Sequence, residues 1–260
     1  MTLRVCVLAS GSGGNSIFVG SETTSILVDA GITKRAMGLR LNEICVKPDQ
    51  ISAICLSHEH HDHMRGLPML QKQFGWDVYA NRGTLEGLQR NEKTRAVNCQ
   101  VFSTGMPFVI GDLTIETFSV PHDAFEPVGF VVCLGDQRVG IVMDAGIPTS
   151  LIRERLRGCQ MLIVESNYDE QLLMAAPRPW HLKQRIRGRQ GHLSNEIAAE
   201  MIAEVAHPGL SHVYLAHLSR ECNREDLAVR TARSLLSRLG HSHIQVLPTY
   251  SDRISEVWTG

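Results

Sequence analysis

The sequence predicts an α+β protein built as a two-sheet sandwich with helices on its outer faces. The first observation behind this is that short apolar segments typical of strands occur in both halves of the chain. The second is that helical segments follow each set of strands. The third is that no linker, low-complexity segment or shift in composition divides the 260 residues. We therefore expect a single domain over residues 1–260, and the two halves are candidates for a loose duplication.

Composition excludes several classes of protein. Apolar residues make up 43% and charged residues 20% of the chain, and the net charge is −1. These values are ordinary for a soluble globular protein, and the overall charge indicates neither a nucleic-acid nor a membrane partner. The apolar run Val5–Ala9 is too short for a signal sequence, and no stretch is long enough to span a bilayer. The seven cysteines include no C-x-x-C pair, so we expect reduced thiols, a cytoplasmic location and no zinc ribbon.

The first three predicted strands cover residues 3–9, 17–19 and 25–29. The glycine-rich segment Ser10–Ser16 between the first two has two equally supported interpretations. It is either a loop in which Ser12 and Asn15 contact a phosphate, or a tight hairpin turn. The third strand ends in Asp29-Ala30-Gly31, and we expect the Asp29 carboxylate to orient a metal-binding histidine from behind. A helix is predicted over residues 33–41.

A metal-binding pattern follows the next predicted strand, residues 53–57. His58-Glu59-His60-His61-Asp62-His63 has the form H-x-H-x-D-H, with four potential metal ligands within six residues. Alternating residues of an extended segment share a face, so His58 and His60 should point together. Asp62 and His63 lie at the turn into a helix and can serve a second ion, whereas His61 should face away. Imidazole and carboxylate ligands suit zinc, iron or manganese.

The remaining segments alternate in type, and residues 91–100 are polar and unassigned. Helices are predicted over residues 67–74, 84–89, 148–157, 168–174, 194–206 and 226–239. Strands are predicted over residues 77–80, 101–102, 108–110, 113–120, 128–134, 137–143, 161–165, 212–216 and 244–247. Three further candidate ligands, His122, Asp144 and His217, each follow the end of one of these strands. Strand ends meet along one edge of a sheet, so these residues can complete a site for two metal ions.

The ordered series of candidates resembles the five motifs of the metallo-β-lactamase superfamily, over nearly the whole chain. The series is Asp29, His58-x-His60-x-Asp62-His63, His122, Asp144 and His217. The resemblance implies a four-layer αββα sandwich with two metals in a shallow groove at the sheet edges. It implies that His58, His60 and His122 hold one metal, that Asp62, His63 and His217 hold the other, and that Asp144 bridges them.

Shorter motifs resemble the YycJ/WalJ branch of that superfamily. They are Ser10–Ser16, Val120–Ala124 with Pro127–Phe130, Glu165–Asn167, Gly191–Asn195 and His217–Ser219. This resemblance implies a small cytoplasmic nuclease with 5′-to-3′ exonuclease activity on DNA. The sequence departs from the pattern at Cys222-Asn223, where two asparagines are expected, which puts a substrate contact at Cys222 in doubt.

Two features between Asp144 and His217 favour a phosphodiester substrate. His192 precedes a predicted helix, as a histidine does in related tRNA-processing enzymes. The resemblance implies that it donates a proton to the leaving 3′-oxygen, and the alternative is an ordinary residue at a helix start. Residues 178–189 hold five Lys/Arg and no acidic residue. Arg185, Arg187 and Arg189 are candidates for a phosphate-backbone track, and a solvated surface loop is an equal alternative.

We therefore expect a metal-dependent phosphodiesterase that hydrolyses nucleic acid with two divalent ions (Zn²⁺, Mn²⁺ or Fe²⁺) and a bridging hydroxide. His192 and Asp62 are the candidate catalytic residues. Only 73 positions separate Asp144 from His217, which leaves no room for a large inserted domain and favours DNA ends over structured RNA. The alternatives are a small-molecule cyclic phosphodiesterase, a glyoxalase-type thioesterase or lactonase, and a regulatory scaffold with structural metals. No membrane partner is expected, and the sequence leaves the oligomeric state open.

Overall fold

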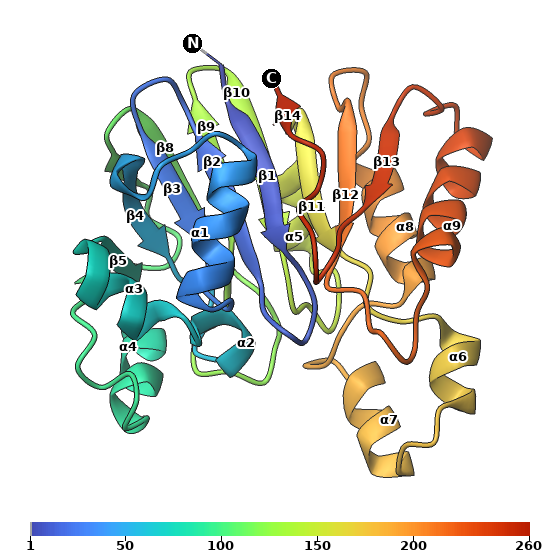
Figure 1. Ribbon diagram of the computed structural model, residues 1–260. Helices are drawn as coiled ribbons and strands as arrows, with labels where there is room; N and C mark the ends of the chain where they lie inside the picture. The colour runs from blue at the N-terminus through green and yellow to red at the C-terminus, as the bar shows by residue number, and fades with distance from the viewer. Residues whose placement is uncertain (1) are drawn as a thin grey trace.

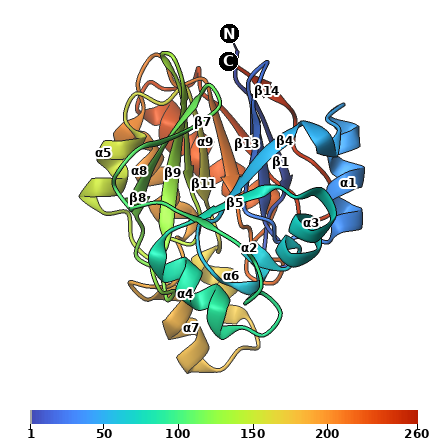
Figure 2. The same ribbon diagram turned by 90° about the vertical axis from the view of Figure 1, so that its left-hand side faces the viewer.

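The computed structural model describes residues 2–260. Two mixed β-sheets pack face to face, and helices cover the outer face of each (Figures 1 and 2). The α+β sandwich that the sequence predicts is thus confirmed. Apolar side chains that alternate along the strands meet between the sheets, which is the arrangement expected of two sheets sharing one core.

The described residues form seven strands in each sheet. The first sheet has the order β14 (Trp258–Thr259), β1 (Arg4–Ala9), β2 (Ser16–Gly20), β3 (Ser25–Val28), β4 (Ile51–Cys55), β5 (Asp77–Ala80) and β6 (Gln100–Val101). The second has the order β13 (Gln245–Pro248), β12 (His212–Ala216), β11 (Met161–Glu165), β10 (Gln137–Val142), β9 (Val128–Leu134), β8 (Leu113–Ser119) and β7 (Phe108–Ile110).

Both sheets share one pairing pattern. In each, three antiparallel pairings are followed by three parallel ones, and the change occurs at β3 in the first sheet and at β10 in the second. Asp29 follows β3 and Asp144 follows β10, so these two carboxylates occupy equivalent positions. The pairing pattern agrees with the loose duplication proposed from the sequence.

The helices lie on the two outer faces and at one end of the sandwich. They are α1 (Lys34–Glu43), α2 (His61–Met64), α3 (Leu67–Phe74), α4 (Arg82–Arg90), α5 (Ser150–Leu156), α6 (Glu170–Ala175), α7 (Trp180–Arg187), α8 (Asn195–Val205) and α9 (Glu225–Arg238), with a 3₁₀ turn at Pro48–Gln50. Helices α1 and α3 bury apolar residues against the first sheet, and α5, α8 and α9 do so against the second. Figure 1 shows α6 and α7 beyond the lower ends of the strands.

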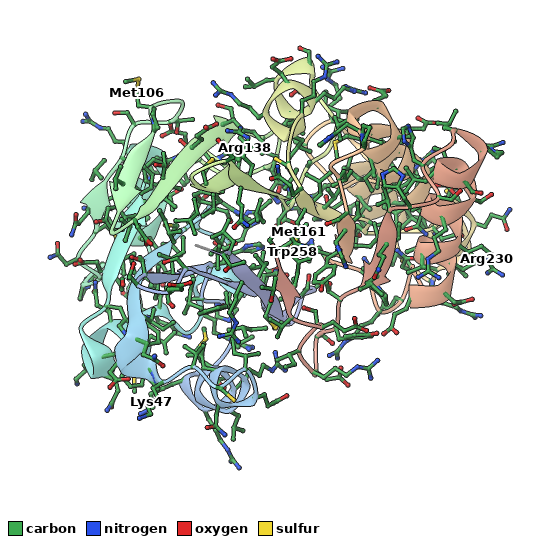
Figure 3. The ribbon with its side chains drawn as sticks, turned by 90° about the horizontal axis from the view of Figure 1, so that it is seen from above. Lys47, Met106, Arg138, Met161, Arg230 and Trp258 are labelled. Carbon is green, nitrogen blue, oxygen red and sulfur yellow. The ribbon has the colours of Figure 1, made fainter. Side chains whose placement is uncertain are left out.

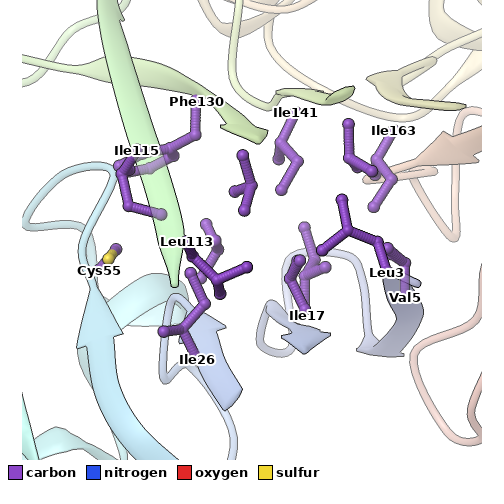
Figure 4. Packing of buried hydrophobic residues seen from close by; sticks show 14 of the residues in the cluster. Leu3, Val5, Ile17, Ile26, Cys55, Leu113, Ile115, Phe130, Ile141 and Ile163 are labelled. Carbon is purple, nitrogen blue, oxygen red and sulfur yellow. The ribbon is translucent and has the colours of Figure 1, made fainter. Parts of the chain in front are cut away.

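The main core lies between the sheets. Figure 4 shows Leu3, Val5 and Ile17, on the side of the first sheet, facing Ile141 and Ile163 of the second sheet. All five side chains are at most 1% exposed. Burying such side chains contributes about 1.5–3 kcal/mol each, which fixes the two sheets and hence the strand ends that carry the candidate ligands.

Two elements differ from the sequence prediction. The basic segment that could have been a surface loop forms α7, because Ile186 and partly buried Leu182 pack into a small apolar cluster with Leu173 and Cys222. The short strand β14 was not expected, and it pairs with β1 through Trp258 opposite Val5. Within residues 2–260, no helix is both long and apolar enough to cross a membrane.

Candidate metal centre

The predicted ligands come from different strands of both sheets and meet at one end of the sandwich. Three of the residues that follow strands, Asp29, Asp144 and His217, have positive φ angles of 65°, 52° and 54°. This left-handed conformation costs a non-glycine residue on the order of 1–2 kcal/mol. The chain turns sharply at each of them, so that the side chain projects across the end of its sheet. Strain of this kind is found where side chains serve a function.

The first group of candidate ligands consists of His58, His60 and His122. Each offers a ring nitrogen, and the three nitrogens lie within 4.8 Å of one another. His122 Nε2 lies 3.3 Å from His60 Nδ1. The sequence prediction that these three imidazoles converge agrees with their positions, and His61 is exposed as expected.

The second group consists of Asp62, His63 and His217. Asp62 Oδ2 lies 3.6 Å from His63 Nε2 and 3.4 Å from His217 Nε2. Asp144 lies between the two groups. Its Oδ2 is 3.7 Å from His58 Nε2 and 2.7 Å from His63 Nε2, and its Oδ1 is 2.7 Å from His217 Nδ1. This is the position that a bridging carboxylate requires.

Buried polar atoms without partners support a cation at this position. Among the residues that the structure describes, both carboxylate oxygens of Asp144, His58 Nε2 and His217 Nε2 are buried and have no hydrogen-bond partner. Asp144 Oδ2 lies 2.7 Å from His63 Nε2 and its Oδ1 lies 2.7 Å from His217 Nδ1, but neither contact is a hydrogen bond. Burying an unpaired polar atom costs roughly 1–3 kcal/mol, so four such atoms aimed at one region need a compensating partner. Imidazole nitrogens and carboxylates are the ligands that Zn²⁺ and Mn²⁺ accept, and these residues therefore fit divalent metals.

Asp29 lies behind His63 as the sequence predicted. Its Oδ2 accepts a hydrogen bond from His63 Nδ1 at 2.7 Å. Ser57 donates to the same carboxylate through its backbone N–H and its hydroxyl, and the hydroxyl also lies 3.0 Å from His58 Nδ1. A carboxylate on one ring nitrogen directs the other nitrogen toward the metal. Asp29 and Ser57 thus orient His63 and His58.

Burial and charge shift the pKa values of these groups in opposite directions. Burial, together with nearby His63, holds the pKa of His58 well below its usual value. Burial would also lower the pKa of His63 and His217, but the carboxylates outweigh it and raise both well above normal: Asp29 and Asp144 act on His63, and Asp144 foremost on His217. For Asp144 burial acts to raise the pKa, but His217 and His63 outweigh it and hold the value well below normal. The metal-free centre is therefore a set of ion pairs in which protons occupy positions that a cation could take.

These shifts predict how the metal-free protein responds to pH. His63 and His217 have folded-state pKa values above the unfolded value of about 6.5. Their stabilisation is complete below pH 6.5 and is lost as pH rises through the folded pKa values. We expect the melting temperature of the chelator-treated protein to fall as pH rises above 6.5. Metal binding requires deprotonated ligands, so the metal-induced rise in melting temperature should grow over the same range. Thermal scans with EDTA and with added Zn²⁺ or Mn²⁺ test this, and a metal-free melting temperature that climbs across the range would contradict it.

Glu165 is a site residue that the sequence analysis missed. It ends β11, it is fully buried, and its Oε1 accepts from His192 Nδ1 at 2.6 Å and lies 3.0 Å from His217 Nδ1. Its Oε2 accepts from the backbone N–H groups of Ala145 and Leu193. The motif Glu165-Ser166-Asn167 at a strand end was the available signal. A carboxylate buried at this point orients two imidazoles at once.

His192 lies beside the predicted metal centre, before α8. Its Nδ1 is 3.2 Å from Asp144 Oδ1 in addition to its bond to Glu165. Burial alone would lower the pKa of His192, but Glu165 and Asp144 outweigh burial and raise the pKa to about 9. A raised pKa favours the protonated imidazole, which is the form that a general acid requires.

The glycine-rich loop contacts the candidate metal ligands, which the sequence did not indicate. Ser12 is exposed, but Asn15 is 1% exposed and its amide nitrogen lies 3.2 Å from Asp62 Oδ2 and 3.0 Å from His63 Nε2. The Asn15 backbone N–H also donates to the Asp62 carbonyl at 2.7 Å. This geometry does not agree with the prediction that Asn15 contacts a substrate phosphate. The Asn15 side chain is enclosed and faces the candidate ligands. Asn15 holds Asp62 in place.

Gly31 allows that contact, and its replacement gives a second prediction. A Cβ at Gly31 would lie 1.6 Å from the Asp62 carbonyl oxygen, so Gly31→Ala must displace the segment that carries Asp62 and His63. We expect a loss of about 1–3 kcal/mol in the free energy of unfolding and weaker metal retention, measured by denaturant titration and elemental analysis. Gly13→Ala is the control, because within the described residues no heavy atom beyond its chain neighbours lies within 4 Å of a Cβ there. Equal stability and metal content in the two variants would argue against this role of Gly31.

The basic segment, residues 178–189, is not a free track for a phosphate backbone, because several of its arginines form ion pairs. Arg185 pairs with Asp123, Arg187 Nη2 lies 2.6 Å from Glu170 Oε1, and Arg178 pairs with Glu221. The acidic partners come from distant parts of the chain, so the local sequence could not reveal them. Arg189 is exposed and makes no ion pair within the described part of the chain. The segment thus carries less uncompensated charge than its composition indicates.

Comparison with known proteins identifies related chains. A family model described as "Beta-lactamase superfamily domain" matches residues 24–218. The chain is 33% identical to the protein named Exodeoxyribonuclease YycJ from Bacillus anthracis, over 92% of this chain and 91% of that one. It is 33% identical to Exodeoxyribonuclease WalJ from Streptococcus pneumoniae serotype 2, over 90% of this chain and 88% of that one. Among solved structures, the metallo-β-lactamase fold protein YhfI from Bacillus subtilis superposes with a TM-score of 0.77 at 22% identity, and the whole of each chain is covered.

Proposed function

Because the chain belongs to the metallo-β-lactamase superfamily and to its YycJ/WalJ-like branch, we propose that it is a metal-dependent DNA exonuclease acting in the 5′-to-3′ direction. The observation that carries the proposal is the convergence of His58, His60, His122, Asp62, His63 and His217 around Asp144, with His192 beside them. This arrangement suits the hydrolysis of a phosphodiester, whose charged oxygens call for cations and whose leaving group calls for a proton.

We propose that two divalent ions, Zn²⁺ or Mn²⁺ with Fe²⁺ as a further candidate, are held by these residues. His58, His60 and His122 would hold one, Asp62, His63 and His217 the other, and Asp144 would contact both. When bound, two such ions supply a hydroxide nucleophile at neutral pH and offset the charge that builds up on the phosphate.

The chain's own residues complete the reaction. Attack on phosphorus breaks the bond to the 3′-oxygen of the departing nucleotide, and that oxygen needs a proton. His192 supplies it, and Glu165 fixes the orientation of the imidazole by accepting a hydrogen bond from Nδ1. Asp62 is held by Asn15 and His217, so its carboxylate stays fixed toward the reacting region. Exposed Ser12 and Arg189, with Arg185 and Arg187 once they exchange their acidic partners, would contact the DNA backbone.

The cysteines indicate the compartment. All seven cysteines, which lie within the described residues 2–260, are free thiols. Proteins of oxidising compartments use such cysteines in disulfides. We therefore propose a reducing environment, the cytoplasm, as the place of action.

The direct test is incubation of the purified protein with 5′-labelled and 3′-labelled DNA and RNA, with Zn²⁺, Mn²⁺ or EDTA. We expect release of single labelled nucleotides from the 5′ end of DNA, dependent on metal. Cleavage of cyclic phosphates or thioesters with no cleavage of DNA would overturn the proposal in favour of the alternatives raised from the sequence.

A further inference from the structure

A small cavity lies beside the candidate metal centre. It has a volume of about 190 Å³. It is lined by His122, Asp123 and His192 and by Arg178, Leu182, Arg185 and Ile186. A water molecule occupies about 30 Å³ in the liquid, so the cavity has room for part of one nucleotide and none for a duplex. It also joins an apolar wall to two guanidinium groups, which is the combination that a nucleotide needs.

The two arginines are held in a way that leaves them available to an anion. Arg178 Nε and Nη2 lie 2.8 Å and 2.6 Å from a single oxygen, Glu221 Oε2. Arg185 Nε lies 2.7 Å from a single oxygen of Asp123, which its Nη2 also contacts. Within residues 2–260 neither Nη1 donates a hydrogen bond. Each pair has one exposed and one partly exposed partner. Surface pairs contribute about 0–1 kcal/mol, so a doubly charged phosphate, which accepts bidentate bonds from arginine, can compete with each carboxylate.

The orientation of His192 relates the cavity to one side of the cleaved bond. Its Nδ1 is hydrogen-bonded to Glu165 and lies 3.2 Å from Asp144 Oδ1, so Nε2 is the ring nitrogen left to face a bound substrate. His192 also lines the cavity. The 3′-oxygen that receives the proton belongs to the departing nucleotide, which in a 5′-to-3′ exonuclease is the terminal one. A terminal nucleotide whose 3′-oxygen met His192 would therefore extend into the cavity that this histidine lines.

We propose that the cavity receives the 5′-terminal nucleotide of the DNA strand and that Arg178 and Arg185 bind its terminal 5′-phosphate. The inference rests on the proposed exonuclease function. The apolar side chains of Leu182 and Ile186 contact the sugar or base, and the two guanidinium groups replace Glu221 and Asp123 with the phosphate. Helix α7, anchored by Ile186, thus makes the enzyme select a phosphorylated 5′ end.

The test compares two DNA substrates of one sequence, with a 5′-phosphate and with a 5′-hydroxyl. We expect the wild-type kcat/KM to be at least about 10-fold higher for the phosphorylated end, through KM. Arg178→Gln and Arg185→Gln should each lower that preference by about 10-fold, as expected for the loss of a charge-assisted bond to phosphate. The matched control is Arg230→Gln. Arg230 is an exposed arginine on α9, paired with Asp226 and labelled at the outer edge of Figure 3, and the control should keep the wild-type preference.

The outcomes separate the two proposals. Failure of the wild-type protein to release nucleotides from either substrate would overturn the exonuclease function itself. Release of nucleotides with equal kcat/KM for the two ends would overturn the terminal-phosphate site alone. The same follows if both arginine variants keep the wild-type preference. Because Arg178 contacts none of the candidate ligands and Arg185 pairs with Asp123 beside His122, a parallel loss of preference in both variants distinguishes phosphate binding from disturbance of the metal centre.

Discussion

Asp144→Ala is expected to strip metal from the purified protein and to lower the rate of DNA hydrolysis by more than about 10³-fold. The Asp144 carboxylate lies 2.7 Å from ring nitrogens of both His63 and His217 and 3.7 Å from His58 Nε2. Its loss removes the contact shared by both proposed ions. The stabilisation of charge by bound metals is worth several kcal/mol, and each 1.36 kcal/mol corresponds to a tenfold change in rate.

Elemental analysis and nucleotide release are the measurements for this variant. Asp144→Asn keeps the shape of the side chain and removes its charge, so it separates metal loss from misfolding, and circular dichroism reports the fold of both variants. Asp136→Ala, at an exposed position on the hairpin between β9 and β10, is the control and should retain metal and activity. Full metal content together with full activity in Asp144→Asn would rule out a bridging role.

The second large effect is expected for His192. His192→Ala should retain metal and slow DNA hydrolysis by roughly 10²–10⁴-fold, the range for loss of a general acid. Bis(p-nitrophenyl) phosphate should be much less affected, because nitrophenolate leaves without a proton. The difference between the two substrates identifies proton donation and excludes general damage to the site.

His181→Ala is the matched control for this comparison, because His181 is an exposed histidine on α7. We expect it to hydrolyse both substrates as the wild type does. If His192→Ala slowed the two substrates by equal factors, the residue would serve in binding or positioning, and the proton would come from elsewhere.

The candidate ligands were predictable from the sequence because each follows a strand. The H-x-H spacing indicated His58 and His60. Because strand ends meet at a sheet edge, His122, Asp144 and His217 were further candidates. The same rule applies to Glu165, which ends β11. A lone glutamate at a strand end is, however, indistinguishable in sequence from a solvated one, and only the packing of His192 and His217 against it reveals its role.

The features that the sequence left undetermined depend on contacts between distant residues. Arg185 and Asp123 are 62 positions apart, and Arg178 and Glu221 are 43 apart, so the compensation of the basic segment has no local signature. Asn15 lies in a loop whose composition suits either a turn or a phosphate site. Its actual contacts are with Asp62 and His63, 47 and 48 positions away.

The most direct test of the account is a titration of metal-free protein with Mn²⁺ or Zn²⁺, in which bound metal and release of 5′-terminal nucleotides are measured together. We expect hydrolysis to be absent without metal and to reach its maximum as two ions bind per chain. Hydrolysis of DNA at full rate by metal-free protein, or a maximum reached with a single ion bound, would contradict it.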